Sequence, residues 1–81
     1  MYSVYVLQSE TSGRLYVGQT QDLERRLREH VGGQTRSTRG RGPWRLLHSR
    51  AFATRAEAVR FERALKAMKQ PGRIQEAFRE R

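Results

Sequence analysis

The stretch YSVYVLQSETSGRLYVG, from Tyr2 to Gly18, contains two β-rich runs with a turn-forming segment between them. The runs Tyr2–Leu7 and Leu15–Gly18 consist largely of β-branched and aromatic residues, which favour strands. The segment Ser9–Arg14 carries Ser, Thr and Gly residues, which are typical of tight turns. Two strands joined by a short, glycine-containing loop predict a β-hairpin.

A helix is predicted directly after the hairpin, over Leu23–Val31. Its two leucines and its valine recur at helical spacing and form one apolar stripe. Asp22 suits the N-cap position, because its carboxylate can accept hydrogen bonds from the first amides of the helix. Arg26 and His30 lie one turn apart at the border of the stripe, and Gly32-Gly33 is a typical helix stop.

The rest of the chain predicts one further strand and two further helices. Trp44–Phe52 has a strand composition, and Thr54 with Glu57 forms a T-x-x-E capping box that opens a helix. The core face of this helix comprises Ala58, Phe61, Leu65 and Met68. Pro71 suits the first turn of a last helix, whose apolar contacts are Ile74, Ala77 and Phe78.

The predicted element order is β-β-α-β-α-α. It favours an α/β (α+β) fold in which a small, three-stranded, largely antiparallel sheet is flanked by helices. The 81 residues contain no internal repeat and no linker, so we expect a single domain over residues 1–81.

The charge of the chain indicates a polyanionic partner. Lys and Arg number 17 against 8 Asp and Glu, which gives a net charge of +9. Such a surface attracts nucleic acid or, as the weaker alternative, anionic lipid, and arginine can bind phosphate in a bidentate manner. The segment Gln34–Pro43 carries three arginines and no acidic residue. The arginines predicted to contact nucleic acid are Arg36, Arg39, Arg41 and Arg45.

Composition also excludes several kinds of site. The chain has no cysteine, which excludes disulfides, thiolate zinc sites and cysteine nucleophiles. No apolar run approaches transmembrane length, and no signal peptide precedes the first strand. We therefore expect no membrane partner and a cytoplasmic location.

The predicted hairpin and helices carry a set of residues at characteristic spacings. Ser3-Val4-Tyr5 is followed by Tyr16-Val17-Gly18, with Arg26 eight residues past the glycine and His30 four residues later. The later helix contains the segment EAVRFE, which ends at Glu62. From about Tyr2 to Lys66, this set resembles the GIY-YIG endonuclease superfamily, and its small stand-alone members in particular.

The resemblance implies a role for each of these residues. It implies that Tyr5 is the general base, that Tyr16 positions the reacting groups, and that His30 assists. Arg26 would clamp the phosphate, and Glu62 would bind a divalent cation, Mg²⁺ or Mn²⁺. A phosphodiester repels nucleophiles and has a poor leaving group, and a divalent cation eases both problems. A tyrosine with its usual pKa of about 10 is a poor base at pH 7, so a nearby cation must lower that pKa.

Gly18 would leave room for the backbone or the DNA substrate at the end of its strand.

The candidate site residues also have structural interpretations. Tyr5 and Tyr16 are then ordinary strand aromatics with their hydroxyls in water, and Glu62 is an i, i+4 partner of Lys66.

The function implied by the resemblance is a metal-dependent DNA endonuclease, directed by branched or damaged structure and linked to repair or recombination, with a protein partner for targeting left open. The alternative is a nucleic-acid-binding module with the same fold and little or no cleavage. It is supported by Gln19, where several relatives carry lysine. It is also supported by the absence of asparagine from the chain, because the repair and homing branches of the family have a late asparagine near the metal site. A weaker third hypothesis is a basic protein associated with RNA or ribosomes.

Overall fold

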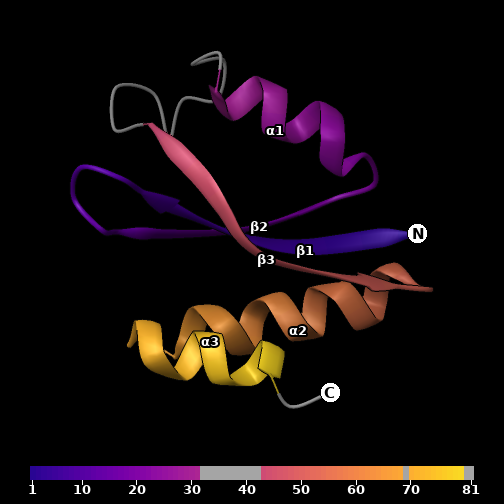
Figure 1. The fold of residues 1–81 in the computed structure, drawn as a ribbon. Helices are drawn as coiled ribbons and strands as arrows, with labels where there is room; N and C mark the ends of the chain where they lie inside the picture. The colour runs from indigo at the N-terminus through magenta and orange to yellow at the C-terminus, as the bar shows by residue number, and fades with distance from the viewer. Residues whose placement is uncertain (32–42, 69, 80–81) are drawn as a thin grey trace.

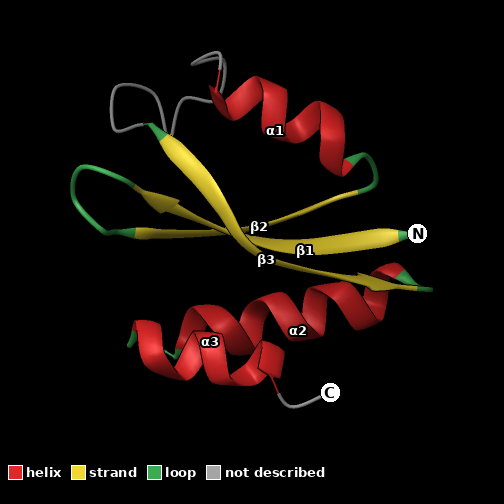
Figure 2. Ribbon diagram, in the orientation of Figure 1, coloured by secondary structure: helices red, strands yellow, loops and turns green. Residues whose placement is uncertain are grey.

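A computed structural model describes residues 1–31, 43–68 and 70–79. The elements in chain order are β1 (Tyr2–Ser9), β2 (Leu15–Thr20), α1 (Leu23–Val31), β3 (Trp44–Phe52), α2 (Arg55–Ala67) and α3 (Pro71–Arg79). Figure 1 traces them along the chain, and Figure 2 shows the same view coloured by secondary structure. The predicted order β-β-α-β-α-α and the predicted α+β fold are confirmed.

The three strands form one sheet in the order β2-β1-β3, so the first strand of the chain lies in the middle. Both pairings of β1 are antiparallel. Tyr5 faces Gly18 on β2 and Ser49 on β3. The register against β3 shifts between Val6 and Leu7, which leaves Leu47 as an extra residue on β3. β2 and β3 are the two edges of the sheet.

Both strands of the hairpin extend two residues beyond their predicted ends. β1 reaches Ser9 and β2 reaches Thr20, and the pairing continues to Ser3 opposite Thr20. The added residues are polar and join the sheet through their backbone groups. A hydrophobic pattern does not predict such pairing. The turn is closed by Gly13, whose φ of 78° lies in the left-handed region that favours glycine.

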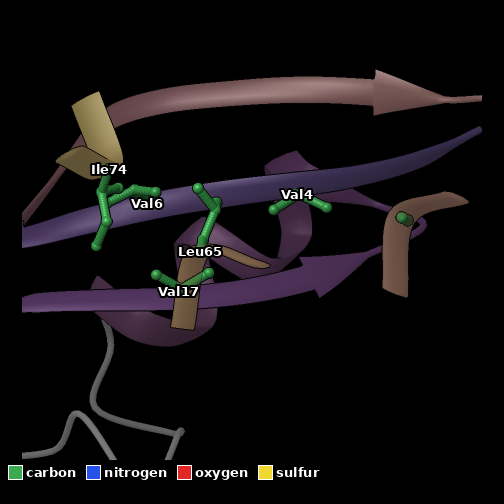
Figure 3. Close-up of a cluster of buried hydrophobic side chains, with 6 residues drawn as sticks. Val4, Val6, Val17, Leu65 and Ile74 are labelled. Atoms are coloured by element: carbon green, nitrogen blue, oxygen red, sulfur yellow. The ribbon is translucent and has the colours of Figure 1, made fainter. Parts of the chain in front are cut away.

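The helices cover both faces of the sheet, with α1 on one face and α2 and α3 on the other (Figure 1). Successive residues of a strand point to opposite faces. Val4 and Val6 therefore point towards α2 and α3, and Tyr5 and Leu7 point towards α1. The core between the sheet and the two later helices, most of it labelled in Figure 3, consists of Val4, Val6, Val17, Ala58, Leu65 and Ile74.

The helix starts follow the predicted caps. The Asp22 carboxylate accepts from the amide of Arg25 at 3.1 Å, which confirms it as the cap of α1. At α2, the Thr54 hydroxyl accepts from the Glu57 amide at 3.2 Å, and the Glu57 carboxylate accepts from the Thr54 amide at 3.3 Å. The capping box is therefore present.

The helices of the described segments are too short or too polar to cross a membrane.

Candidate functional site

Tyr5 is fully buried at the centre of β1, with 0% of its surface exposed. Its ring lies across the facing Gly18: a Cβ atom at that position would be 2.5 Å from the Tyr5 hydroxyl oxygen and 2.7 Å from Cζ. Sequence reasoning predicted room for backbone or substrate at Gly18, and the structure places the tyrosine side chain there. Because β2 is an edge strand, the glycine lets the Tyr5 hydroxyl reach the edge of the sheet.

Two groups from α1 contact the Tyr5 hydroxyl. His30 Nε2 lies 3.1 Å from the hydroxyl oxygen, and Arg26 Nε donates to that oxygen at 3.3 Å. The four-residue spacing brings both side chains to one helix face. A phenol can donate one hydrogen bond while it accepts another. With the imidazole proton on Nδ1, the hydroxyl donates to His30 and accepts from Arg26.

His30 is more deeply buried than the two leucines of the apolar stripe on its helix. Its exposed fraction is 3%, whereas Leu23 and Leu27 are only half-buried. Helical periodicity had placed this histidine at the border of the stripe. The reason for the difference lies in the sheet, because the ring packs edge-on against Tyr16 at 5.0 Å and against Tyr5 at 5.8 Å between centroids.

Burial and charge set the protonation states of this group. Burial raises the pKa of Tyr5, and the hydrogen bond from Arg26 opposes the increase. Burial lowers the pKa of His30, and the Arg26 charge lowers it further. The hydrogen bond to Tyr5 raises the pKa of Arg26. At neutral pH the site therefore holds a protonated phenol, a neutral imidazole and a charged guanidinium.

Glu29 fixes the arginine and was not among the predicted site residues. Arg26 Nη1 donates to Glu29 Oε1 at 2.9 Å, and the Arg26 side chain keeps 35% of its surface exposed. The i, i+3 spacing on a helix was the available signal for this pair. The ion pair holds one end of the guanidinium and leaves part of it accessible from outside.

Tyr16 extends the aromatic group towards the start of β3. Its ring centroid lies 6.3 Å from that of Tyr5 and 6.4 Å from that of Trp44. Sequence reasoning did not select Trp44, because the two residues are far apart in the chain and no local pattern links them. The structure therefore joins Tyr5, Tyr16, Arg26 and His30 in one cluster.

Glu62 comes from α2, on the other side of the sheet. Gln19 Nε2 donates to Glu62 Oε1 at 3.4 Å, and Lys66 Nζ lies 3.0 Å from Oε2. Gln19 neighbours Gly18 on the edge strand, so Glu62 and the Tyr5 hydroxyl approach the same sheet edge from opposite faces. The charge of Glu62 contributes to the raised pKa of Tyr5, which is consistent with this placement.

The donor set fits only one kind of metal site. Among residues 1–31, 43–68 and 70–79, no three His, Asp or Glu side chains are grouped as metal ligands. Glu62 is a single hard oxygen donor. Mg²⁺ often binds through one or two carboxylates, with waters and substrate phosphates completing its shell. The residues present therefore fit a hydrated Mg²⁺ or Mn²⁺ at Glu62, and they do not form a preassembled cage.

The predicted DNA contacts are only partly within the described residues. Arg36, Arg39 and Arg41 lie outside them. Arg45 is exposed on β3, and its Nη2 donates to the side-chain oxygen of Gln8 at 3.4 Å. A DNA-binding role for Gly18 and for these arginines stays a prediction.

Comparison with known proteins identifies a family and several relatives. A family profile described as the GIY-YIG catalytic domain matches residues 1–75. A UPF0213 protein of Halalkalibacterium halodurans is 42% identical over 64 residues, which cover 78% of this chain and 67% of that protein. The structure-specific endonuclease subunit SLX1 of Homo sapiens is 39% identical over 67 residues, which cover 76% of this chain and 24% of that protein.

A solved structure extends the similarity to the fold. The solution NMR structure of a UPF0213 protein from Bacillus halodurans is similar with a TM-score of 0.61 and 35% sequence identity, over 99% of this chain and 86% of that one. The profile match, the aligned relatives and the fold agree over most of the sequence. The chain therefore belongs to the GIY-YIG nuclease family.

Proposed function

We propose that the protein is an endonuclease that hydrolyses phosphodiester bonds in DNA with the help of a divalent metal ion. The observation that carries the proposal is the Tyr5 hydroxyl, bound by His30 at 3.1 Å and by Arg26 at 3.3 Å beside a sheet edge. A buried tyrosine hydroxyl usually finds a hydrogen-bond partner, and here both partners are ionisable side chains rather than backbone groups. A phenol held between an imidazole and a cation is suited to proton transfer.

Tyr5 and His30 act together as the base in this proposal. The lowered pKa of His30 keeps its ring neutral at pH 7, so that Nε2 can accept a proton. The raised pKa of Tyr5 means that the phenol keeps its proton until water supplies another. As the water oxygen bonds to phosphorus, a water proton moves to the Tyr5 oxygen and the original phenol proton moves to His30. The leaving alkoxide takes its proton from solvent.

Arg26 stabilises the negative charge of the phosphate. Glu29 and Tyr5 hold the guanidinium at Nη1 and Nε, so it is oriented before the substrate binds. Fixed donors of this kind favour the charge that develops in a transition state. The remaining exposure of Arg26 leaves the guanidinium accessible to a phosphate oxygen.

Glu62 is the residue that would hold the metal ion. When bound, Mg²⁺ or Mn²⁺ would neutralise phosphate charge and polarise the phosphoryl oxygen. Gln19 would keep the carboxylate oriented, since its amide donates to one of the two oxygens.

The substrate and biological role are proposed from the relatives. Those named structure-specific endonuclease subunits support recognition of branched or damaged DNA, a role in repair or recombination, and a protein partner. The small size of the chain and its charge of +9 favour contacts with the DNA backbone over reading of a long sequence. The cytoplasmic location stays a prediction.

A cleavage assay tests the proposal. Purified protein is incubated with labelled single-stranded, duplex, flapped and four-way-junction DNA, with Mg²⁺, Mn²⁺ or EDTA. Glu62→Gln is expected to lower the cleavage rate by about a hundredfold or more, comparable to removing one transition-state-stabilising group. DNA affinity should stay nearly unchanged. Glu76→Gln makes the same charge change at an exposed position of α3 and should cleave normally.

The second candidate is a nucleic-acid-binding module without cleavage. It is favoured by the full burial of Tyr5 and by the ion pair that Glu62 makes with Lys66. Binding of every substrate without a metal-dependent product would establish this function instead, and would leave Tyr5 and Glu62 with structural roles.

A further inference from the structure

The two oxygens of the Glu62 carboxylate have partners of different kinds. Oε1 accepts from the neutral amide of Gln19 at 3.4 Å, and Oε2 lies 3.0 Å from the ammonium of Lys66. A neutral donor on one oxygen leaves the other able to bind a cation. An ammonium on that second oxygen occupies the place that a metal ion would take, and its charge repels the metal ion.

The two partners also differ in how firmly they are held. Gln19 belongs to β2, where it pairs with Val4 in the sheet and is half-buried. The Lys66 side chain is 59% exposed, whereas that of Glu62 is only 17% exposed. An exposed i, i+4 ion pair is weak and salt-sensitive. Lys66 can therefore leave the carboxylate at little cost, while Gln19 remains in place.

From this contrast we propose that Lys66 is an exchangeable counter-ion, which covers the Glu62 carboxylate in the DNA-free protein and gives way to the metal ion. The inference rests on the proposed function, because it takes Glu62 as the metal ligand. It assigns Lys66 a positioning role that the family pattern did not include.

The exchange has a consequence for the order of binding. Glu62 supplies one carboxylate, and among the described residues no group of three or more His, Asp or Glu side chains could hold a metal ion. With Lys66 in place, the free protein binds a divalent ion poorly. A DNA phosphate attracts the Lys66 ammonium and also supplies oxygen ligands for the metal ion. Metal loading is thereby coupled to substrate binding.

Direct measurement of Mn²⁺ binding tests this role without relying on cleavage. Unbound Mn²⁺ is followed by electron paramagnetic resonance during titration of the DNA-free protein. Lys66→Met should bind Mn²⁺ about three- to tenfold more tightly than the unaltered protein, because one positive charge within a few ångström has been removed. Lys66→Arg, which keeps the charge, should bind as weakly as the unaltered protein.

Arg60→Met is the matched control for net charge. Arg60 is exposed on α2 and lies about 160° around the helix from Glu62, so this variant removes the same charge away from the carboxylate. It should change Mn²⁺ affinity less than twofold. The double variant Lys66→Met, Glu62→Gln should not show the tighter Mn²⁺ binding that is expected for Lys66→Met alone. Equal affinities for Lys66→Met and Arg60→Met, or no Mn²⁺ binding by either, would overturn the proposal.

The cleavage assay separates this inference from the proposed function. If Glu62→Gln abolishes cleavage but Lys66→Met binds Mn²⁺ no better than Arg60→Met, the inference fails and the nuclease function stands. If the unaltered protein cleaves no substrate, the proposed function fails whatever the Mn²⁺ titrations show.

Discussion

At the scale of single residues, the site depends on the missing side chain at Gly18. The Tyr5 ring occupies the space in which a Cβ atom would lie. The tyrosine reaches its two α1 partners only because the facing strand position has no side chain. Gly18 therefore affects the site indirectly, because it leaves space for the Tyr5 side chain.

Substitution of Gly18 by alanine is expected to damage both stability and activity. The new methyl group would meet the hydroxyl and Cζ of Tyr5, so the ring must move away from His30. Forcing extra volume into a packed site costs about 1–3 kcal/mol. Denaturant unfolding gives the stability change, and cleavage per folded molecule gives the effect on the site.

Gly13→Ala is the control for a destabilised hairpin. Gly13 has a positive φ, and no neighbouring heavy atom lies within 4 Å of the place that a Cβ would take. Alanine there strains the backbone by about 1–2 kcal/mol without touching the site. Folded Gly13→Ala should cleave normally. A Gly18→Ala protein with unchanged cleavage would show that the position of Tyr5 does not matter.

His30 is expected to make stability depend on pH. Its pKa is lowered in the folded protein, so below the unfolded value of about 6.5 the unfolded chain binds more protons than the native one. The stability that the neutral His30 imidazole contributes to the folded protein is complete above that pH. It is lost as the pH falls through the pKa of His30 in the folded protein. His30→Gln should lose less stability between pH 7 and pH 5 than the unaltered protein. Unfolding curves at both pH values measure this, and equal losses would contradict the buried, neutral imidazole.

At the scale of elements, sequence pattern located each helix and strand of the described residues, but it missed features that depend on contacts with the sheet. Helical spacing identified α1, and the T-x-x-E pattern located the start of α2, because both signals are local. The two strands of the hairpin were predicted too short, because the polar residues at their ends pair through backbone groups. The burial of His30 was missed because it comes from tyrosines on other elements.

The candidate site was predictable in part for the same reason. Tyr5, Tyr16, Arg26 and His30 were found from the family pattern, and the structure brings them together. The bond from Gln19 to Glu62 joins residues 43 positions apart, so only the fold could reveal it. The ion pair of Glu62 with Lys66 was predicted from i, i+4 spacing as the structural interpretation of Glu62, and it is present. The bearing of this ion pair on a metal site became clear only with the hydrogen bond from Gln19 to the other oxygen of Glu62.

At the scale of the whole molecule, the charge of +9 predicts DNA binding that weakens steeply with salt. Each phosphate contact adds about 0.9 to the slope of log affinity against log salt concentration for duplex DNA. Arg45→Gln should therefore lower that slope by about 1 and weaken binding on all duplexes alike. Fluorescence anisotropy at several salt concentrations measures the slope.

Arg73→Gln provides the comparison for Arg45. Arg73 is exposed on α3, on the face of the sheet away from α1 (Figure 1). Its loss changes the net charge equally and should leave the slope nearly unchanged. If both variants lower the slope by the same amount, the prediction of a specific contact at Arg45 is wrong.

The central position of β1 also determines how the protein folds. The hairpin with β2 closes over a short turn, an event of microseconds in isolated hairpins. The pairing with β3 joins residues 35 to 50 positions apart, from Ser9 with Trp44 to Tyr2 with Phe52, and closing so long a loop is slower and entropically more costly. During refolding we expect the strand that carries Tyr5 to be paired on one side only until β3 pairs with it. The site around Tyr5 should therefore form at the rate of this long-range pairing and later than the hairpin itself.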